Sequence, residues 1–157
     1  MRENNKKFSA RGPRDEFDHK IIDIRRTARV VAGGRRFSFR VSVAVGDKKG
    51  RVGVGVGKSV DTPSAIEKAI KKAKKSLVKP VLTKDFSIPH ETEAKFGSAK
   101  VLIRPVLKGR GLVAGSSVRV VLELAGIRGV NAKIISRSKN KLNNARAAIK
   151  ALEKIKK

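Results

Sequence analysis

The stretch Gly50-Arg-Val-Gly-Val-Gly-Val-Gly-Lys58 runs through residues 59–66 into a lysine-rich segment that ends at Lys79. Valine and glycine alternate along it with the period of two that is typical of a β-strand, and Pro63 stands where the first turn of a helix can begin. A glycine-rich strand that leads into a helix is either a phosphate-binding loop or a surface shaped for the close approach of another backbone. The remaining sequence decides between these two interpretations.

The phosphate-binding interpretation fails on spacing. Gly57-Lys58-Ser59 matches the end of the motif G-x-x-x-x-G-K-[ST], but the leading glycine would stand at position 52, which is Val52. The G-x-G-x-x-G pattern does not fit either, because its third glycine comes one residue early. The predicted helix also begins too late to aim its amides at a phosphate in the loop. We therefore interpret Gly53, Gly55 and Gly57 as a bare face that RNA or a second module can approach closely.

Two predicted strands precede the glycine-rich strand. Residues from Ile21 alternate between apolar and polar, with an irregularity at Arg25-Arg26 that predicts a bulge, and Gly33-Gly34 predicts a hairpin turn because glycine tolerates positive φ. A lysine-covered helix with an apolar stripe follows, so residues 20–80 are predicted to fold as β-β-β-α. One apolar sheet face is expected to combine Phe37, Phe39, Val41, Val43, Val45, Val52, Val54 and Val56.

Residues 81–157 form a predicted second module. Two strands end near Ala94 and Val106, a helix over residues 116–125 is closed by Gly126, and a short strand at residues 130–135 leads to a final amphipathic helix. This order is β-β-α-β-α. The fold class is therefore α+β with two small domains. Residues 1–19 show no periodicity and are expected to form a basic flexible arm.

The charge of the chain predicts a polyanionic partner. Its 157 residues include 39 Lys and Arg against 13 Asp and Glu, a formal net charge of +26. A membrane is disfavoured as the partner, because Trp and Tyr are absent and no apolar run approaches the roughly 20 residues of a membrane span. Nucleic acid is the expected partner. The absence of cysteine and of an apolar N-terminal signal segment leads us to expect a cytoplasmic location.

No catalytic or cofactor site is expected. His19 and His90 are the only histidines and lack metal-ligand spacing, so both are interpreted as surface or structural residues. Glu91, Glu93 and Glu123 are expected to pair with nearby cations. The sequence therefore predicts a binding protein that has no cofactor and is not an enzyme.

Arginines of the first module give the strongest signal for RNA binding. Arg25, Arg29 and Arg40 are predicted to project from the outer face of adjoining strands, and Arg35-Arg36 lies at the hairpin tip. The guanidinium group matches phosphate oxygens bidentately. Because Trp and Tyr are absent and the two phenylalanines of the second strand are expected to be buried, recognition is predicted to use phosphates, sugars and shape rather than base stacking.

Several linked motifs resemble a known family. In order, they are Gly33-Gly-Arg-Arg-Phe-Ser-Phe39, Val45-Gly-Asp47, Gly50-Arg-Val-Gly53, Gly57-Lys58, Pro63, Ala65-Ile66, Gly109-Arg-Gly111, Ala114-Gly115, Arg119 and Leu122-Glu-Leu-Ala-Gly126. Over residues 21–156 the pattern resembles the bacterial small ribosomal subunit protein S-five (S5) family. The resemblance implies a double-stranded-RNA-binding-like fold without the usual leading helix. It also implies the S5 C-terminal fold, with an uncommon left-handed β-α-β connection.

The resemblance implies partners as well. A member of this family is a constituent of the small ribosomal subunit that contacts small-subunit rRNA, mRNA at the channel entrance, and the neighbouring ribosomal proteins S-four (S4) and S-eight (S8). Residues 33–35 match the family's rRNA-contacting loop, which is linked to decoding and spectinomycin sensitivity, although Ala32 stands where the family often has lysine. Arg26 and Arg29 match positions that line the mRNA entrance and help to unwind mRNA.

The complete predicted site combines the two kinds of inference. The residues expected to bind RNA are Arg25, Arg26, Arg29, Gly33, Gly34, Arg35, Arg36, Arg40, Arg51 and Lys58. The residues expected at the interface with S4, which influences translational accuracy, are Gly109, Arg110, Gly111 and Arg119. Two alternatives remain open: a free-standing double-stranded-RNA-binding or chaperone protein, and a phosphate-binding transferase, because the fold class of the second module also occurs in small-molecule kinases.

Overall fold

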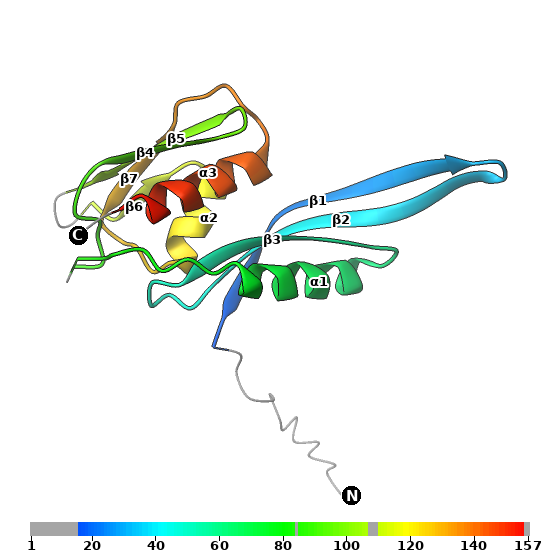
Figure 1. Cartoon of the computed structure of the whole chain (residues 1–157), viewed down its shortest axis with the longest axis horizontal. Helices are drawn as coiled ribbons and strands as arrows, with labels where there is room; N and C mark the ends of the chain where they lie inside the picture. Colours follow the sequence, from blue (N-terminus) through cyan, green and yellow to red (C-terminus); the bar gives the residue numbers. More distant parts are fainter. Residues whose placement is uncertain (1–15, 84, 107–109, 156–157) are drawn as a thin grey trace, which may run out of the picture.

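The first module of the computed structural model is a three-stranded antiparallel sheet with one helix. The structure describes residues 16–83, 85–106 and 110–155. The sheet has the order β1 (Asp18–Val31), β2 (Gly34–Gly46), β3 (Val52–Ser59), and α1 (Thr62–Lys75) packs on one of its faces (Figure 1). The predicted β-β-β-α order is confirmed. Residues 1–15 of the predicted arm lie outside the described residues, and β1 already begins at Asp18.

The second module is a four-stranded mixed sheet with two helices. Along the chain it consists of β4 (Thr92–Phe96), β5 (Ala99–Pro105), β6 (Leu112–Ala114), α2 (Ser116–Leu124), β7 (Val130–Ile134) and α3 (Lys141–Glu153). The sheet order is β4-β5-β7-β6, and β6 runs parallel to β7. The α+β class with two modules is confirmed, but the predicted β-β-α-β-α order missed β6. A three-residue strand is too short to show a period of two.

The glycines of β3 face the helix of their own module. A Cβ atom built on Gly57, Gly55 or Gly53 would lie 2.0, 2.1 or 2.6 Å from the backbone oxygen of Ala65, Ala69 or Ala73, respectively. The three alanines are buried and recur every four residues, so they form a ridge along α1. Because these glycines have no side chains, the backbone of α1 packs directly against the backbone of β3. The interpretation that RNA or the second module approaches these glycines is wrong.

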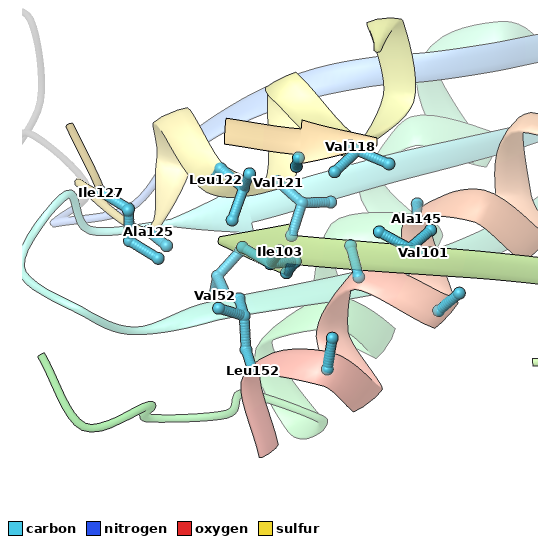
Figure 2. Close-up of a cluster of buried hydrophobic side chains, with 14 of the residues drawn as sticks. Val52, Val101, Ile103, Val118, Val121, Leu122, Ala125, Ile127, Ala145 and Leu152 are labelled. Carbon is cyan, nitrogen blue, oxygen red and sulfur yellow. The ribbon is translucent and has the colours of Figure 1, made fainter. Parts of the chain in front are cut away.

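The valines of β3 lie on the opposite sheet face, which the second module covers. Cross-strand partners share a face, and Val41, Val43 and Val45 pair with the three glycines rather than with the β3 valines. Val52 and Val54 belong to the large hydrophobic cluster with residues of β5, α2 and α3, and Figure 2 shows Val52 near Ile103 and Leu152. The predicted single apolar face is therefore split between two cores.

Close packing joins the two modules at the β2–β3 turn. A Cβ atom on Gly46 would lie 2.3 Å from the backbone oxygen of Leu124, and one on Gly126 would lie 2.2 Å from the backbone oxygen of Lys48. The Lys48 backbone N–H donates to the Leu124 carbonyl at 2.9 Å. The glycines that admit the second module are thus outside the glycine-rich strand. The inner end of the β1–β2 hairpin lies between α1 and this module, and its outer end projects away from both (Figure 1).

Candidate nucleic-acid interface

The outer end of the hairpin is a two-stranded ribbon. Strand β3 ends opposite Phe39, so residues 27–31 of β1 and 34–38 of β2 pair only with each other. The turn comprises Ala32 and Gly33, and Gly34 is the first residue of β2 with a φ of +125°. The predicted Gly33-Gly34 turn is therefore displaced by one residue. The predicted bulge is displaced as well, because the register of β1 shifts between Ile21 and Asp23 rather than at Arg25-Arg26.

Five predicted RNA-binding cations share one face of the sheet. Arg25, Arg40 and Lys58 are cross-strand neighbours on β1, β2 and β3, and Arg29 pairs with Arg36 four residues further out. Cross-strand partners point to the same side, and four residues of strand separate the two rows by about 13 Å. We call this set the cation face: Arg25, Arg29, Arg36, Arg40 and Lys58. All five residues are exposed.

One carboxylate partly neutralises the inner end of the cation face. Asp23 accepts a hydrogen bond from Arg25 Nε at 2.7 Å, and Lys141 Nζ at the start of α3 lies 3.6 Å from its other oxygen. The hydrogen bond from Arg25 lowers the pKa of Asp23 against the opposing effect of burial. Within the described ranges, no carboxylate lies within 4 Å of the charged groups of Arg29, Arg36 or Arg40. The outer row is therefore free to meet external anions.

The ribbon's opposite face carries Arg26 and Arg35. Arg26 pairs with Phe39 and Arg35 with Val30, which places both side chains on the side of the sheet that α1 covers. Arg26 Cζ lies 4.3 Å from the centroid of the Phe37 ring. Phe37 is 42% exposed, so the expectation that it is buried is wrong. Arg26 and Arg29, which were predicted to act together at the mRNA entrance, point to opposite sides of the ribbon.

Arg51 lies at the other end of β3 from the ribbon. Its Nε donates to Asp47 Oδ2 at 2.6 Å, and the other Asp47 oxygen accepts the backbone N–H groups of Lys49 and Arg51 at 2.8 and 2.9 Å. Burial alone raises the pKa of Asp47, but these hydrogen bonds outweigh it and lower the pKa below its ordinary value of 3.8. The guanidinium carbon of Arg51 also lies over the Phe17 ring, 4.9 Å from its centroid. The structure therefore gives Arg51 a role in holding the β2–β3 turn.

Two of the residues predicted for the S4 interface border one cavity. Gly111 and Arg119 line a hollow of about 500 Å³ that also involves Lys48 of the first module. The remaining lining residues are Phe86, Leu112, Glu123, Gly126, Ile127 and Arg128. Arg110 is exposed beside it in sequence, and Gly109 lies outside the described residues. Lys48 and Arg128 also line the cavity but were not predicted as site residues. The only feature of the sequence that could have indicated them is that each basic residue lies close to glycines of a turn.

Other kinds of site find no support in the described part of the chain. There, no group of three His, Cys, Asp or Glu side chains is placed to hold a metal ion. None of the helices described is long and apolar enough to cross a membrane. A phosphate cradle at Gly57 is excluded by the contact of this glycine with α1.

Comparison with known proteins agrees with the architecture. The family model "Ribosomal protein S5, N-terminal domain" matches residues 17–79, and "Ribosomal protein S5, C-terminal domain" matches residues 94–157. The chain belongs to the ribosomal protein S5 family. Among curated relatives, small ribosomal subunit protein uS5c of Rhodomonas salina is 48% identical over 141 residues, covering 90% of this chain and 83% of the relative. Small ribosomal subunit protein uS5 of Thermosynechococcus vestitus is 50% identical over 137 residues, covering 87% and 78%.

Proposed function

We propose that the protein is a structural constituent of the small ribosomal subunit of a cytoplasmic ribosome and binds small-subunit rRNA through its β1–β2 ribbon. Membership of the S5 family supports the assembly. The observation that carries the mode of binding is the cation face, where Arg29 opposes Arg36 and Arg25 opposes Arg40. Like charges directly opposite each other destabilise a sheet, so an isolated protein gains nothing from this arrangement. A phosphate backbone removes that repulsion.

The finer assignments follow the family resemblance. We propose that Arg26 and Arg29 contact mRNA at the channel entrance, with the loop over residues 33–35 on rRNA. The proposed contact with S4 uses Arg110, Gly111 and Arg119, and it is supported by the mixed-charge cavity that Gly111 and Arg119 border. S8 is proposed as a further neighbour. No catalytic role is proposed.

Ribosomes that carry a doubly substituted protein test both the structural role in the small subunit and the proposed mRNA contact. Arg26→Ala with Arg29→Ala removes two exposed side chains outside both hydrophobic clusters, so folding and assembly are expected to persist. The unsubstituted protein should remain stoichiometric in small subunits through a high-salt wash, and the doubly substituted protein should remain stoichiometric at the salt concentration of the translation assay, because Arg25, Arg36, Arg40 and Lys58 are retained. Translation through structured mRNA should slow, and translation of unstructured mRNA should not.

Each outcome has a distinct meaning. Dissociation of the unsubstituted protein from small subunits at modest salt, without fixed stoichiometry, would favour the free double-stranded-RNA binder. Equal effects on structured and unstructured messages would remove the mRNA assignment and leave the structural role intact. Saturable ATP binding that Lys58→Ala abolishes would support the transferase alternative, against which the covered Gly57 argues.

A further inference from the structure

The α1 side of the ribbon carries an apolar strip. Its side chains share a face because each pairs across the hairpin with another member of the set, which consists of Arg26, Ala28, Val30, Arg35, Phe37 and Phe39. Helix α1 packs on β3 and on the part of β2 that pairs with β3, and β3 ends opposite Phe39. Further out, Val30 is 76% and Phe37 42% exposed, and neither belongs to a hydrophobic cluster of the described residues. The strip is therefore apolar surface with an aromatic ring at its inner end.

The ring and an arginine form a stack within this strip. Arg26 and Phe37 are diagonal neighbours, since Arg26 pairs with Phe39 and Phe37 with Ala28. The guanidinium carbon lies over the ring, 4.3 Å from its centroid. A guanidinium held against one ring offers its other plane to a second π system, and RNA-binding proteins use arginine planes and aromatic rings to stack unpaired bases. Arg26 makes no salt bridge within the described part of the chain.

We infer that the Arg26–Phe37 stack binds an unpaired nucleobase of RNA. This rests on the proposed function, because the RNA held by the cation face would supply the base. The two faces belong to the same pair of strands, so one partner that meets both must offer anions on one side and a flat apolar group on the other. A looped RNA strand offers phosphates and unstacked bases in this way. Phe37 acts as the positioning residue, and Arg26 meets the base.

A stack of this kind lets a chain without Trp or Tyr recognise a base. The sequence pattern disfavoured base stacking because the alternation of β2 made Phe37 a core residue. Because β3 ends opposite Phe39, Phe37 pairs with β1 alone and has no strand on its other side. One exposed Phe and one arginine provide a platform for one base, whereas phosphate contacts dominate the remaining surface.

Salt dependence separates base stacking from phosphate binding. The affinity of the full-length protein is measured over a range of KCl concentrations, using small-subunit rRNA assembled with the other small-subunit proteins. Phe37→Leu and Arg26→Lys keep every charge, so each should weaken binding about tenfold while the slope of log affinity against log salt stays unchanged. Phe37→Tyr keeps the ring and should restore most of the affinity. Arg29→Ala with Arg36→Ala should lower the slope by about 0.7 to 0.9 for each phosphate that the variant no longer neutralises.

The possible outcomes distinguish the two claims. Wild-type affinity in Phe37→Leu and Arg26→Lys, together with a reduced slope in Arg29→Ala with Arg36→Ala, overturns the stacking platform and leaves RNA binding by the cation face. Unchanged affinity and slope in every variant overturn both. If Phe37→Leu weakens binding to the assembled particle but not to protein-free rRNA, the strip meets a neighbouring protein and the inference is wrong. Circular dichroism confirms folding, which the exposure of both side chains leads us to expect.

Discussion

The two halves of the β1–β2 hairpin have the same backbone pairing and opposite surroundings. Every residue from 41 to 46 is buried, because β3, α1 and the second module surround the inner part of β2. On the ribbon, residues 28–37 are all exposed. Close packing restricts side-chain size in the inner part of β2 and in the strand β3 beside it, where glycine, alanine and valine predominate. Charge limits the outer half, where arginines oppose each other. A substitution should therefore act on stability through volume in one half and through electrostatics in the other.

The largest effect is expected from adding a single methyl group to β3, the strand that pairs with the inner part of β2. In Gly55→Ala the new Cβ atom would lie 2.1 Å from the backbone oxygen of Ala69 and 2.6 Å from the backbone nitrogen of Ala73. These are backbone atoms of a helix, so α1 must move away from the sheet. We expect the free energy of unfolding to fall by about 3 kcal/mol or more, measured by urea denaturation with circular dichroism.

A matched control lies in the outer half. A Cβ atom added to Gly33 would have no other atom within 4 Å, and Gly33 has no positive φ. Gly33→Ala should therefore change the free energy of unfolding by less than about 0.5 kcal/mol. Similar decreases in the free energy of unfolding for Gly55→Ala and Gly33→Ala would contradict the view that close packing restricts only the inner region.

A smaller effect is expected at the turn that sets the register of the inner half. The side chain of Asp47 is 4% exposed, and Asp47→Asn keeps an oxygen acceptor for the backbone N–H groups but removes the charge beside Arg51. We expect the free energy of unfolding to fall by about 1 to 2 kcal/mol at neutral pH. The folded-state pKa of Asp47 is lowered, so its contribution is present above about pH 4 and is lost as the pH falls through the folded-state pKa.

The measurement is urea denaturation at several pH values. Asp47→Asn should lie closest to the wild type at the acid end, where the wild-type carboxylate is protonated too. Asp61→Asn is the control, because Asp61 is exposed at the N-cap of α1 and makes no side-chain capping hydrogen bond. A difference between Asp47→Asn and wild type that stays constant from neutral pH to about pH 3 would show that the charge contributes nothing.

The same turn explains why the sequence predicted the elements well and their faces poorly. Alternation within β2 and within β3 was interpreted correctly, and so was the β-β-β-α order of the first module. Which face of β3 joins which face of β2 depends on the turn between them, where five residues, 47–51, separate the pair Gly46 and Val52. A turn one residue longer or shorter would have aligned the valines as predicted. Asp47 hydrogen bonds and the positive φ angles of Lys48 and Gly50 set this length.

The candidate site was predictable in composition but not in arrangement. Charge and the hairpin motif identified the arginines, and the period of two placed Arg25, Arg29 and Arg40 on one face. The contact of Arg51 with Asp47 was not predicted, because an Asp four residues earlier in an irregular segment becomes a partner only once the turn is formed. Phe37 was predicted to be buried because nothing in β2 itself indicates where β3 ends. Local patterns contain neither the conformation of the turn nor the extent of the neighbouring strand.

The smallest effect, and the one with the opposite sign, is expected in the outer half. Arg36 lies directly opposite Arg29, and Arg36→Gln removes one charge of the pair. Stability should rise by about 0.5 kcal/mol at low ionic strength, and the gain should disappear at about 1 M salt, where the Debye length falls to about 3 Å. Thermal unfolding at several salt concentrations measures it.

Arg104 provides the control for the predicted increase in stability. It is also exposed on a strand, but its Nε lies 2.9 Å from Glu91 Oε2 and its cross-strand partner is Asn131. Arg104→Gln should therefore leave stability unchanged or lower it slightly, because it removes an attraction. If Arg36→Gln destabilised the protein as Arg104→Gln does, the arginine pair would stabilise the ribbon by itself. The cation face would then need no polyanion to explain it, and repulsion between its arginines would no longer favour RNA binding on that face.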